Sequence, residues 1–292
     1  MKVRNNLVLI VILIIGTSTL FSTFALSDRE AKTQIVIDGT KYYALIIGVE
    51  KFENINATEY AHYIDDDAIA MYNMLNNSNN WKTSHIKLLL NENATKDNIR
   101  DNITEWLDDR EDQDDVVLIY FSGHGWRMPF SHRKEGHAYI IPYDSPDSHY
   151  CEGVITDKEL DSWLDELESN KIVVILDSCY SGRMFSLRQE GRVILAAGGK
   201  YILCPVDESE ELGHGIFTHF LLQGFNGSAD KNNDSWVSAE EAFHYARFPT
   251  FKYSFFYQFP FIKLSGIIPP QLPYMYDQYQ GEIKLVRYTY SL

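Results

Sequence analysis

Apolar and polar positions along the chain follow two regular patterns. Short runs of consecutive apolar residues, many of them β-branched, are typical of strands buried on both faces of a sheet. Stretches in which apolar residues recur every three or four positions are typical of amphipathic helices. The apolar runs predict strands over residues 42–49, 86–90, 116–121, 171–176 and 193–197, and a short apolar piece over 138–142.

The helical pattern falls between these runs. Thr156 is placed as an N-cap, and Glu159 completes a capping box at the start of one such segment. The predicted helices span residues 65–75, 95–107, 156–167, 215–223 and 239–246. Strands that alternate with helices predict an α/β fold, a three-layer sandwich with a mostly parallel central sheet and helices on both faces.

Beyond this alternation the pattern is harder to interpret. The segment 248–292 is rich in Phe, Tyr and Pro, and only residues 282–288 have the pattern of a further strand. No change in composition marks a second domain. We therefore expect a single domain over residues 27–292, with its core at about 40–250 and an aromatic C-terminal extension.

The N-terminus has the composition of a targeting segment. Lys2 and Arg4 precede an apolar run from Leu7 to Gly16, and a milder stretch continues to Leu26. Residues 1–26 are interpreted as a signal peptide cleaved after small residues near Ala25. The alternative is an uncleaved membrane anchor over residues 7–26, which is just long enough to span a bilayer. Both interpretations place the globular part outside the cytoplasm, secreted or membrane-attached.

The charge of the chain bears on its partners, and its cysteines bear on disulfide pairing. The 292 residues carry a formal net charge of −15, which argues against nucleic acid as a partner because phosphate binding needs a basic face. There are three cysteines. Cys151 and Cys204 can pair in an exported protein and leave Cys179 as a thiol, or both can be unpaired core residues.

Two of the buried runs end in residues with reactive side chains. Val116–Phe121 leads into Ser122-Gly123-His124-Gly125, and Lys171–Leu176 leads into Asp177-Ser178-Cys179-Tyr180-Ser181-Gly182. Open parallel sheets bind ligands at the carboxyl ends of their strands. A thiol is a strong nucleophile only as the thiolate, which a nearby imidazole favours. The pattern therefore predicts a catalytic pair, Cys179 as nucleophile and His124 as general base.

These two blocks resemble the His and Cys blocks of the caspase, metacaspase and legumain group of cysteine peptidases. The resemblance covers about residues 40–250 and is greatest to metacaspases and their prokaryotic relatives, which also carry Ser-Gly-His-Gly and Asp-Ser-Cys-x-Ser-Gly. It implies a caspase-like fold, peptide or protein substrates and no cofactor for the chemistry. It also implies an oxyanion hole made by the backbone N–H groups of Gly125 and Cys179.

The resemblance also suggests a substrate pocket. Asp177 matches the acid that lines the pocket for a basic P1 side chain in metacaspases, although legumains have an acid there and accept Asn. Asp67 lies in Asp65-Asp66-Asp67-Ala68, which resembles a second acidic block of that pocket. Two acids favour Lys or Arg at P1 through charge-assisted hydrogen bonds. The alternatives are a turn-capping role for Asp177 and a favourable charge at a helix N-terminus for Asp67.

A second acidic segment has the spacing of a calcium-binding loop. Oxygen ligands at loop positions 1, 3 and 5, a backbone carbonyl at position 7 and a Glu at position 12 are the pattern of an EF-hand loop. The residues at these positions are Asp230, Asn232, Asp234, Trp236 and Glu241, with Ser238 at position 9. Position 6 is Ser235 instead of the expected Gly. The alternative is a solvated acidic turn that caps the next helix.

The sequence thus predicts a cysteine endopeptidase with a His124–Cys179 dyad and a preference for Arg, Lys or Asn at P1. One alternative is a legumain-like transamidase, in which an amine replaces water as the acyl acceptor. The other is a catalytically silent protein of caspase-like fold with a binding or regulatory role.

Overall fold

The computed structural model describes residues 39–53, 62–146, 152–200, 208–265 and 270–288, without the side chains of 257–265. Residues Gly39–Leu292 form one compact unit. The predicted targeting segment lies outside the described residues, and so do Cys151 and Cys204, so the two expectations about them stay predictions.

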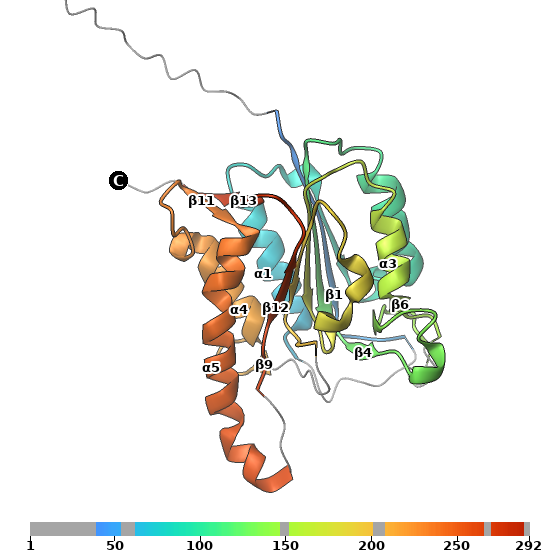
Figure 1. Ribbon diagram of the computed structural model, residues 1–292, viewed down its shortest axis with the longest axis vertical. Coiled ribbons are helices and arrows are strands. Elements are labelled where there is room, and N and C mark those ends of the chain that lie inside the picture. The colour runs from blue at the N-terminus through green and yellow to red at the C-terminus, as the bar shows by residue number, and fades with distance from the viewer. Residues whose placement is uncertain (1–38, 54–61, 147–151, 201–207, 266–269, 289–292) are drawn as a thin grey trace, which may run out of the picture. The chain divides into compact units, whose positions relative to one another are not determined.

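The core of this unit is a six-stranded sheet with the strand order β12-β8-β7-β3-β1-β2. Every neighbouring pair is parallel except β12 and β8, which are antiparallel at one edge. This is the mostly parallel α/β architecture that the sequence predicts (Figure 1). The strands are β1 (Tyr42–Val49), β2 (Ile86–Leu90), β3 (Val116–Gly123), β7 (Ile172–Asp177), β8 (Arg192–Ala196) and β12 (Tyr274–Asp277).

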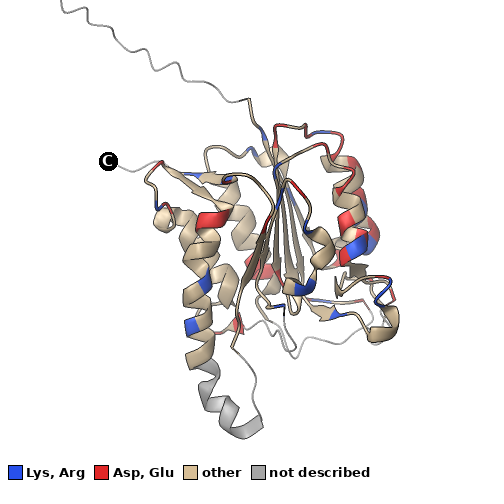
Figure 2. Cartoon of the chain, viewed as in Figure 1, with Lys and Arg blue, Asp and Glu red and all other residues tan. Residues whose placement is uncertain are grey.

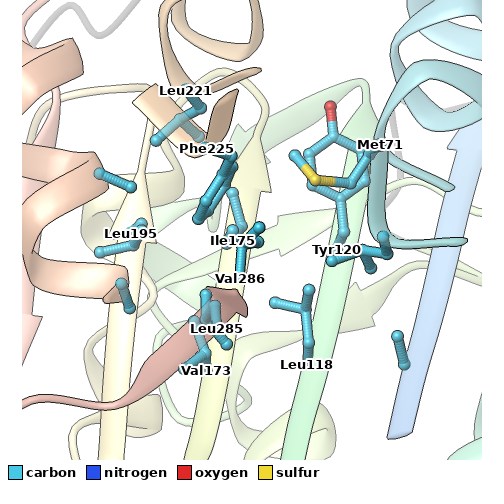
Figure 3. Close-up of a cluster of buried hydrophobic side chains, with 14 of the residues drawn as sticks. Met71, Leu118, Tyr120, Val173, Ile175, Leu195, Leu221, Phe225, Leu285 and Val286 are labelled. Carbon is cyan, nitrogen blue, oxygen red and sulfur yellow. The ribbon is translucent and has the colours of Figure 1, made fainter. Parts of the chain in front are cut away.

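Helices cover both faces of the sheet because alternate residues of each buried strand point to opposite sides. On one face, Leu118 and Tyr120 of β3 pack in a cluster with α1 (Ile64–Asn76), α4 (Ile216–Gln223) and α5 (Ala239–Ser265) (Figure 3). On the other face, Val117 and Ile119 pack against the helices between β2 and β3 and before β7. Those helices are α2 (Lys96–Asp101), continued as a π-helix over Asn102–Leu107, and α3 (Asp157–Leu164).

The helix ends agree closely with the sequence signals, with one large exception. The capping box of Thr156 and Glu159 is present at the start of α3. Helix α5, predicted to stop at Ala246, is 27 residues long and ends at Ser265, after the aromatic segment that the sequence pattern did not resolve. Among the described residues, no helix combines the length and the apolar character needed to cross a bilayer.

Three small sheets lie around the core. The strands β4 (Gly125–Arg127), β5 (Ala138–Ile140) and β6 (Ile155–Thr156) form an antiparallel sheet directly after the end of β3. A second pair, β9 (Glu208–Ser209) and β10 (His214–Gly215), precedes α4. The third pair is β11 (Trp236–Ser238) with β13 (Lys284–Arg287), the latter close to the strand predicted over 282–288.

Candidate active site

His124 and Cys179 follow two neighbouring central strands at the same edge of the sheet. In the parallel register of β3 and β7, Ser122 is paired with Asp177. His124 comes two residues after Ser122, and Cys179 comes two residues after Asp177. Both side chains are partly exposed, in contrast to the buried residues of the strands that carry them. The sheet therefore delivers the predicted base and nucleophile to adjacent positions at its carboxyl edge.

The turn after β7 holds Cys179 in a fixed backbone geometry. Tyr180 has a φ of 60°, the left-handed conformation that non-glycine residues adopt rarely. The next residues are tied to the end of β8, because Gly198 N–H donates to Ser181 Oγ at 2.9 Å and Gly182 N–H donates to Gly198 O at 3.0 Å. A Cβ on Gly182 would lie 2.5 Å from that same carbonyl oxygen. The sharp turn is therefore built into the sequence and stabilised by a neighbouring strand.

His124 is held by contacts to both its backbone and its ring. Its carbonyl oxygen accepts a hydrogen bond from Ile141 N–H at 3.0 Å, which joins it to the sheet of β4 and β5. Its ring stacks on Phe52, with ring centroids 5.7 Å apart. Burial lowers the pKa of His124 below its usual value, because desolvation disfavours the imidazolium form. The neutral imidazole, the form that accepts a proton, is thus favoured at neutral pH.

Gly125 lies directly against the cysteine turn. A Cβ at this position would lie 2.6 Å from Cys179 O and 3.0 Å from Ser178 Oγ. Only a glycine allows the two backbone segments to approach so closely. The two residues whose amides are predicted to form the oxyanion hole are therefore in contact.

The two predicted pocket acids also meet. A Cβ on Gly215 would lie 2.8 Å from Asp67 Oδ2 and 3.0 Å from Asp177 Oδ2, so both carboxyls border the same point in space. Gly215 N–H donates to Asp67, while Thr218 donates to Asp177 Oδ2 from its N–H at 3.1 Å and from its hydroxyl at 2.5 Å. Asp177 Oδ1 is buried and has no hydrogen-bond partner among the described residues.

Burial changes the protonation of this acidic pair. Desolvation raises the pKa of Asp177 to about 6, although the Thr218 hydrogen bonds oppose the shift. The pKa of Asp67 is raised well above its usual value by burial and by the charge of Asp177. Both carboxyls therefore hold a proton to higher pH than an exposed aspartate does.

One further acid, Glu208, and one histidine, His214, lie beside this pair, and a second acid, Glu50, lies near Glu208; none of the three was identified from the sequence. Glu208 of β9 accepts a hydrogen bond from His62 N–H at 2.9 Å, and its charge raises the pKa of both Asp67 and Asp177. Glu50, whose pKa burial raises to about 7, follows directly after β1 and could have been found by the rule for strand ends. Neither Glu208 nor His214, whose Nδ1 lies 2.8 Å from Asp67 Oδ1, has a sequence signal.

The predicted calcium loop follows α4 and its π-helical continuation (Gly224–Ser228), includes β11 and ends in the first turn of α5. Asp230 accepts hydrogen bonds from the backbone of Asp234 and Ser235 and from the Tyr288 hydroxyl. Asp234 forms an ion pair with Lys284 at 2.7 Å, and the two carboxylate oxygens of Glu241 accept backbone N–H groups.

The loop carboxylates are thus engaged within the protein. In the described part of the chain, no group of three or more His, Cys, Asp or Glu side chains is placed to hold a metal ion. Calcium binding by Asp230, Asn232, Asp234, Trp236 and Glu241 stays a prediction.

The comparisons with known proteins agree with the fold and with the two motif blocks. The family model for the caspase domain matches residues 41–243, most of the chain and both blocks. The chain therefore belongs to the caspase domain family of cysteine peptidases.

A solved structure is similar in fold. The crystal structure of protein GSU0716 from Geobacter sulfurreducens has a TM-score of 0.56 and 15% sequence identity, and the match covers 82% of this chain and 94% of that chain. At this identity the likeness concerns the fold alone. No curated protein matches this chain significantly.

Proposed function

We propose that this protein is a cysteine endopeptidase that acts through Cys179 and His124. The observation that carries the proposal is the register of β3 and β7, which brings both residues to one edge of the sheet. Cys179 Sγ attacks the scissile carbonyl carbon while His124 accepts the thiol proton. His124 then returns that proton to the leaving amine, and water hydrolyses the resulting thioester.

The charge that develops on the substrate carbonyl oxygen needs backbone donors. The N–H groups of Gly125 and Cys179 are assigned this role, since the two residues lie in contact beside the nucleophile. Such donors cost no reorganisation when the charge forms, because the turn that carries them is already fixed by neighbouring strands.

The acidic pair is proposed as the pocket for the P1 side chain. Asp177 Oδ1, which has no partner among the described residues, is the atom proposed to accept a hydrogen bond from a P1 guanidinium or ammonium group. Glu208 adds negative charge nearby. Asn at P1 is the alternative, because the raised pKa of Asp67 favours its protonated form, which can donate a hydrogen bond to an amide oxygen.

The catalytic unit is proposed to lie outside the cytoplasm, released or attached through residues 7–26. The support is the basic and then apolar N-terminal sequence. Mass spectrometry of the exported protein identifies its mature N-terminus and so distinguishes release from membrane attachment. Cleavage near Ala25 supports release, whereas an intact N-terminus in the membrane fraction supports an anchor.

Covalent labelling tests the peptidase function. The full chain is treated with acyloxymethyl ketones that carry Arg, Lys, Asn or Ala at P1, and the labelled residue is identified by mass spectrometry. We expect labelling of Cys179 that is lost in Cys179→Ala and His124→Ala and retained in the control Cys204→Ala. Absence of labelling in a folded protein would indicate the silent alternative.

Product analysis separates hydrolysis from transamidation. A peptide substrate is incubated with and without an added amine. We expect mainly the free acid in both cases, whereas a dominant amide product would identify the transamidase alternative.

A further inference from the structure

Helix α5 has an exposed aromatic face that the proposed peptidase chemistry does not use. Phe248, Phe255 and Phe256 are 68%, 37% and 64% exposed. Together with exposed Lys252 they follow the spacing i, i+4, i+7 and i+8, so they lie on one side of the helix. Residues on the other side, such as Thr250 and Ser254, are buried. Between residues 247 and 256 the helix thus packs by small residues and presents three large aromatic residues outward, whereas Phe243 nearer its start is buried.

This face borders a hollow between α5 and α4. The hollow has a volume of about 640 Å³. Its wall includes Phe220 of α4, whose ring centroid lies 6.4 Å from that of Tyr253. One acid, Glu211, also borders the hollow, where it accepts a hydrogen bond from the Tyr253 hydroxyl at 2.9 Å. The lining residues are Glu211, Phe220, Phe248, Pro249, Lys252, Tyr253 and Phe256.

The charge of this segment is opposite to that of the rest of the chain. From Ala242 to Tyr276 the sequence contains no Asp or Glu, whereas it contains Arg247, Lys252 and Lys263. The whole chain has a formal net charge of −15. After its acidic first turn, the described part of α5 has only basic and uncharged positions (Figure 2).

The aromatic segment lies beyond the match to the family model. The match to the caspase domain ends at residue 243, just before Arg247 and Phe248. Neither the chemistry of Cys179 nor the acidic pocket needs these side chains. This face holds three of the seven exposed large hydrophobic residues in the described part of the chain. Exposed apolar residues that are grouped on one face generally mark an interaction surface.

We propose that this face of α5, defined by Phe248, Lys252, Phe255 and Phe256, docks on the surface of an anionic lipid bilayer. Aromatic side chains with flanking basic residues are the composition of helices that lie in the membrane interface. Phe side chains on the apolar side of such helices insert at the boundary between headgroups and acyl chains, and Lys and Arg attract anionic headgroups. The strongly acidic remainder of the molecule is repelled by such a surface, so α5 is the face that approaches it.

The test measures the depth of one residue, so that a contribution from residues 7–26 does not affect it. Full chains with Phe256→Trp are mixed with phosphatidylglycerol vesicles whose acyl chains carry bromine, a quencher of Trp emission. The control is Phe130→Trp, because Phe130 is 86% exposed but lies outside this face. Subtracting the emission of the unsubstituted chain isolates the added Trp.

We expect about two-fold quenching at position 256 and none at position 130. Adding Lys252→Glu to Phe256→Trp should abolish most of the quenching. Brominated phosphatidylcholine vesicles should quench the Trp emission of both variants only slightly. Phe256→Trp alone should keep the peptidase activity of the unsubstituted chain.

Absence of quenching at position 256 with phosphatidylglycerol would overturn the proposal, as would equal quenching by both lipids. A concentration-dependent dimer without vesicles, lost in Phe248→Ser, would also overturn it and assign the face to a second copy of the chain.

Discussion

Ser122 of β3 and Asp177 of β7 are register partners, and this pairing determines where the chemistry of the protein lies. Each residue precedes a candidate catalytic side chain by two positions. A shift of one residue in this register would send every side chain of one strand to the opposite face of the sheet, which would disrupt both hydrophobic clusters. The same packing that stabilises the sheet therefore aligns His124 with Cys179.

Gly125→Ala should lower peptidase activity by about 100-fold or more, because the added methyl must displace the cysteine turn and the proposed oxyanion donors. The new Cβ would lie 2.6 Å from Cys179 O, a backbone atom that cannot rotate away. The measurement is kcat/KM on a peptide substrate, together with the melting temperature. Gly39→Ala is the matched control, since a Cβ there meets nothing within 4 Å. Wild-type activity in folded Gly125→Ala would remove Gly125 from the proposed site.

The protein should be more stable at pH 5.5 than at pH 8. The buried carboxyl of Asp177 has its pKa raised to about 6, and those of Glu50, Glu111 and Glu240 are raised to about 7. These carboxyls therefore bind more protons in the folded state than in the unfolded state between about pH 4 and pH 7, and their contribution to stability falls as pH rises through this range. Burial also lowers the pKa of four of the described histidines, which acts in the opposite direction, but by a smaller amount for each group. For Asp177 alone, about two pKa units correspond to on the order of 3 kcal/mol.

Asp177→Asn tests whether the buried Asp177 carboxylate lowers stability at high pH, because the amide has no charge to bury. We expect its melting temperature at pH 8 to rise by up to roughly 6 °C, and the difference between pH 5.5 and pH 8 to shrink. Asp66→Asn, a change at an exposed neighbour of Asp67, should have no such effect. An unchanged or lower melting temperature at pH 8 in Asp177→Asn would show that burial of the ionised carboxylate does not destabilise the fold.

Calcium should stabilise the protein weakly, because the ion must compete with Lys284 for Asp234. Differential scanning fluorimetry with millimolar calcium should give a small rise in melting temperature that is larger in Lys284→Met and absent in Asp230→Asn. Magnesium is the control ion, since it demands a tighter octahedral site. If neither the wild type nor Lys284→Met responds to calcium, the loop is the solvated acidic turn that was the alternative interpretation.

The sequence was sufficient for the parts of the fold in which burial and local signals agree. The strands Tyr42–Val49 and Ile86–Leu90 have the predicted bounds, and the capping box at Thr156 is present. These elements are largely apolar runs or have a cap whose hydrogen bonds lie within four residues. Both features can be identified without knowledge of the rest of the fold.

The extension of α5 could not be predicted, because tertiary packing overrides its local preferences. Pro249 and the aromatic residues around it are poor helix formers. The helix continues because Thr250 and Ser254 are buried against the domain. Thr250 Oγ1 donates to Ala246 O within the helix, and Ser254 Oγ accepts from Gln271 N–H outside it. The last of these contacts spans 17 residues, which no local pattern reveals.

The composition of the acidic pocket also depends on tertiary packing that the sequence does not reveal. Asp177 and Asp67 could be proposed from motif blocks, but Glu208 lies on a short hairpin whose position depends on the packing of α4 and α1. Its approach to the pair follows from tertiary structure alone. The number of charges in the pocket, on which P1 preference depends, was therefore beyond the sequence analysis.

The pH dependence of kcat/KM should differ between substrates with Arg and with Asn at P1. His124 must be neutral to act as base, and its lowered pKa places the loss of that function below pH 6.5 for both substrates. A cationic P1 group needs ionised Asp177 as well, whose pKa in the unliganded protein is about 6. Activity on the Arg substrate should therefore fall as pH drops through about 6, whereas activity on the Asn substrate should persist to lower pH.

Two peptides that differ only at P1 allow the measurement. Asp177→Asn should lower kcat/KM for the Arg peptide by about 30-fold or more, because a buried charged hydrogen bond is lost, and should change the Asn peptide only a few-fold. Asp66→Asn again serves as the matched control. Two outcomes would exclude Asp177 as the group that recognises a basic P1 side chain: coincident pH profiles for the two peptides, or an equal loss of kcat/KM on both in Asp177→Asn. Either would indicate that its role is to hold the turn before Cys179.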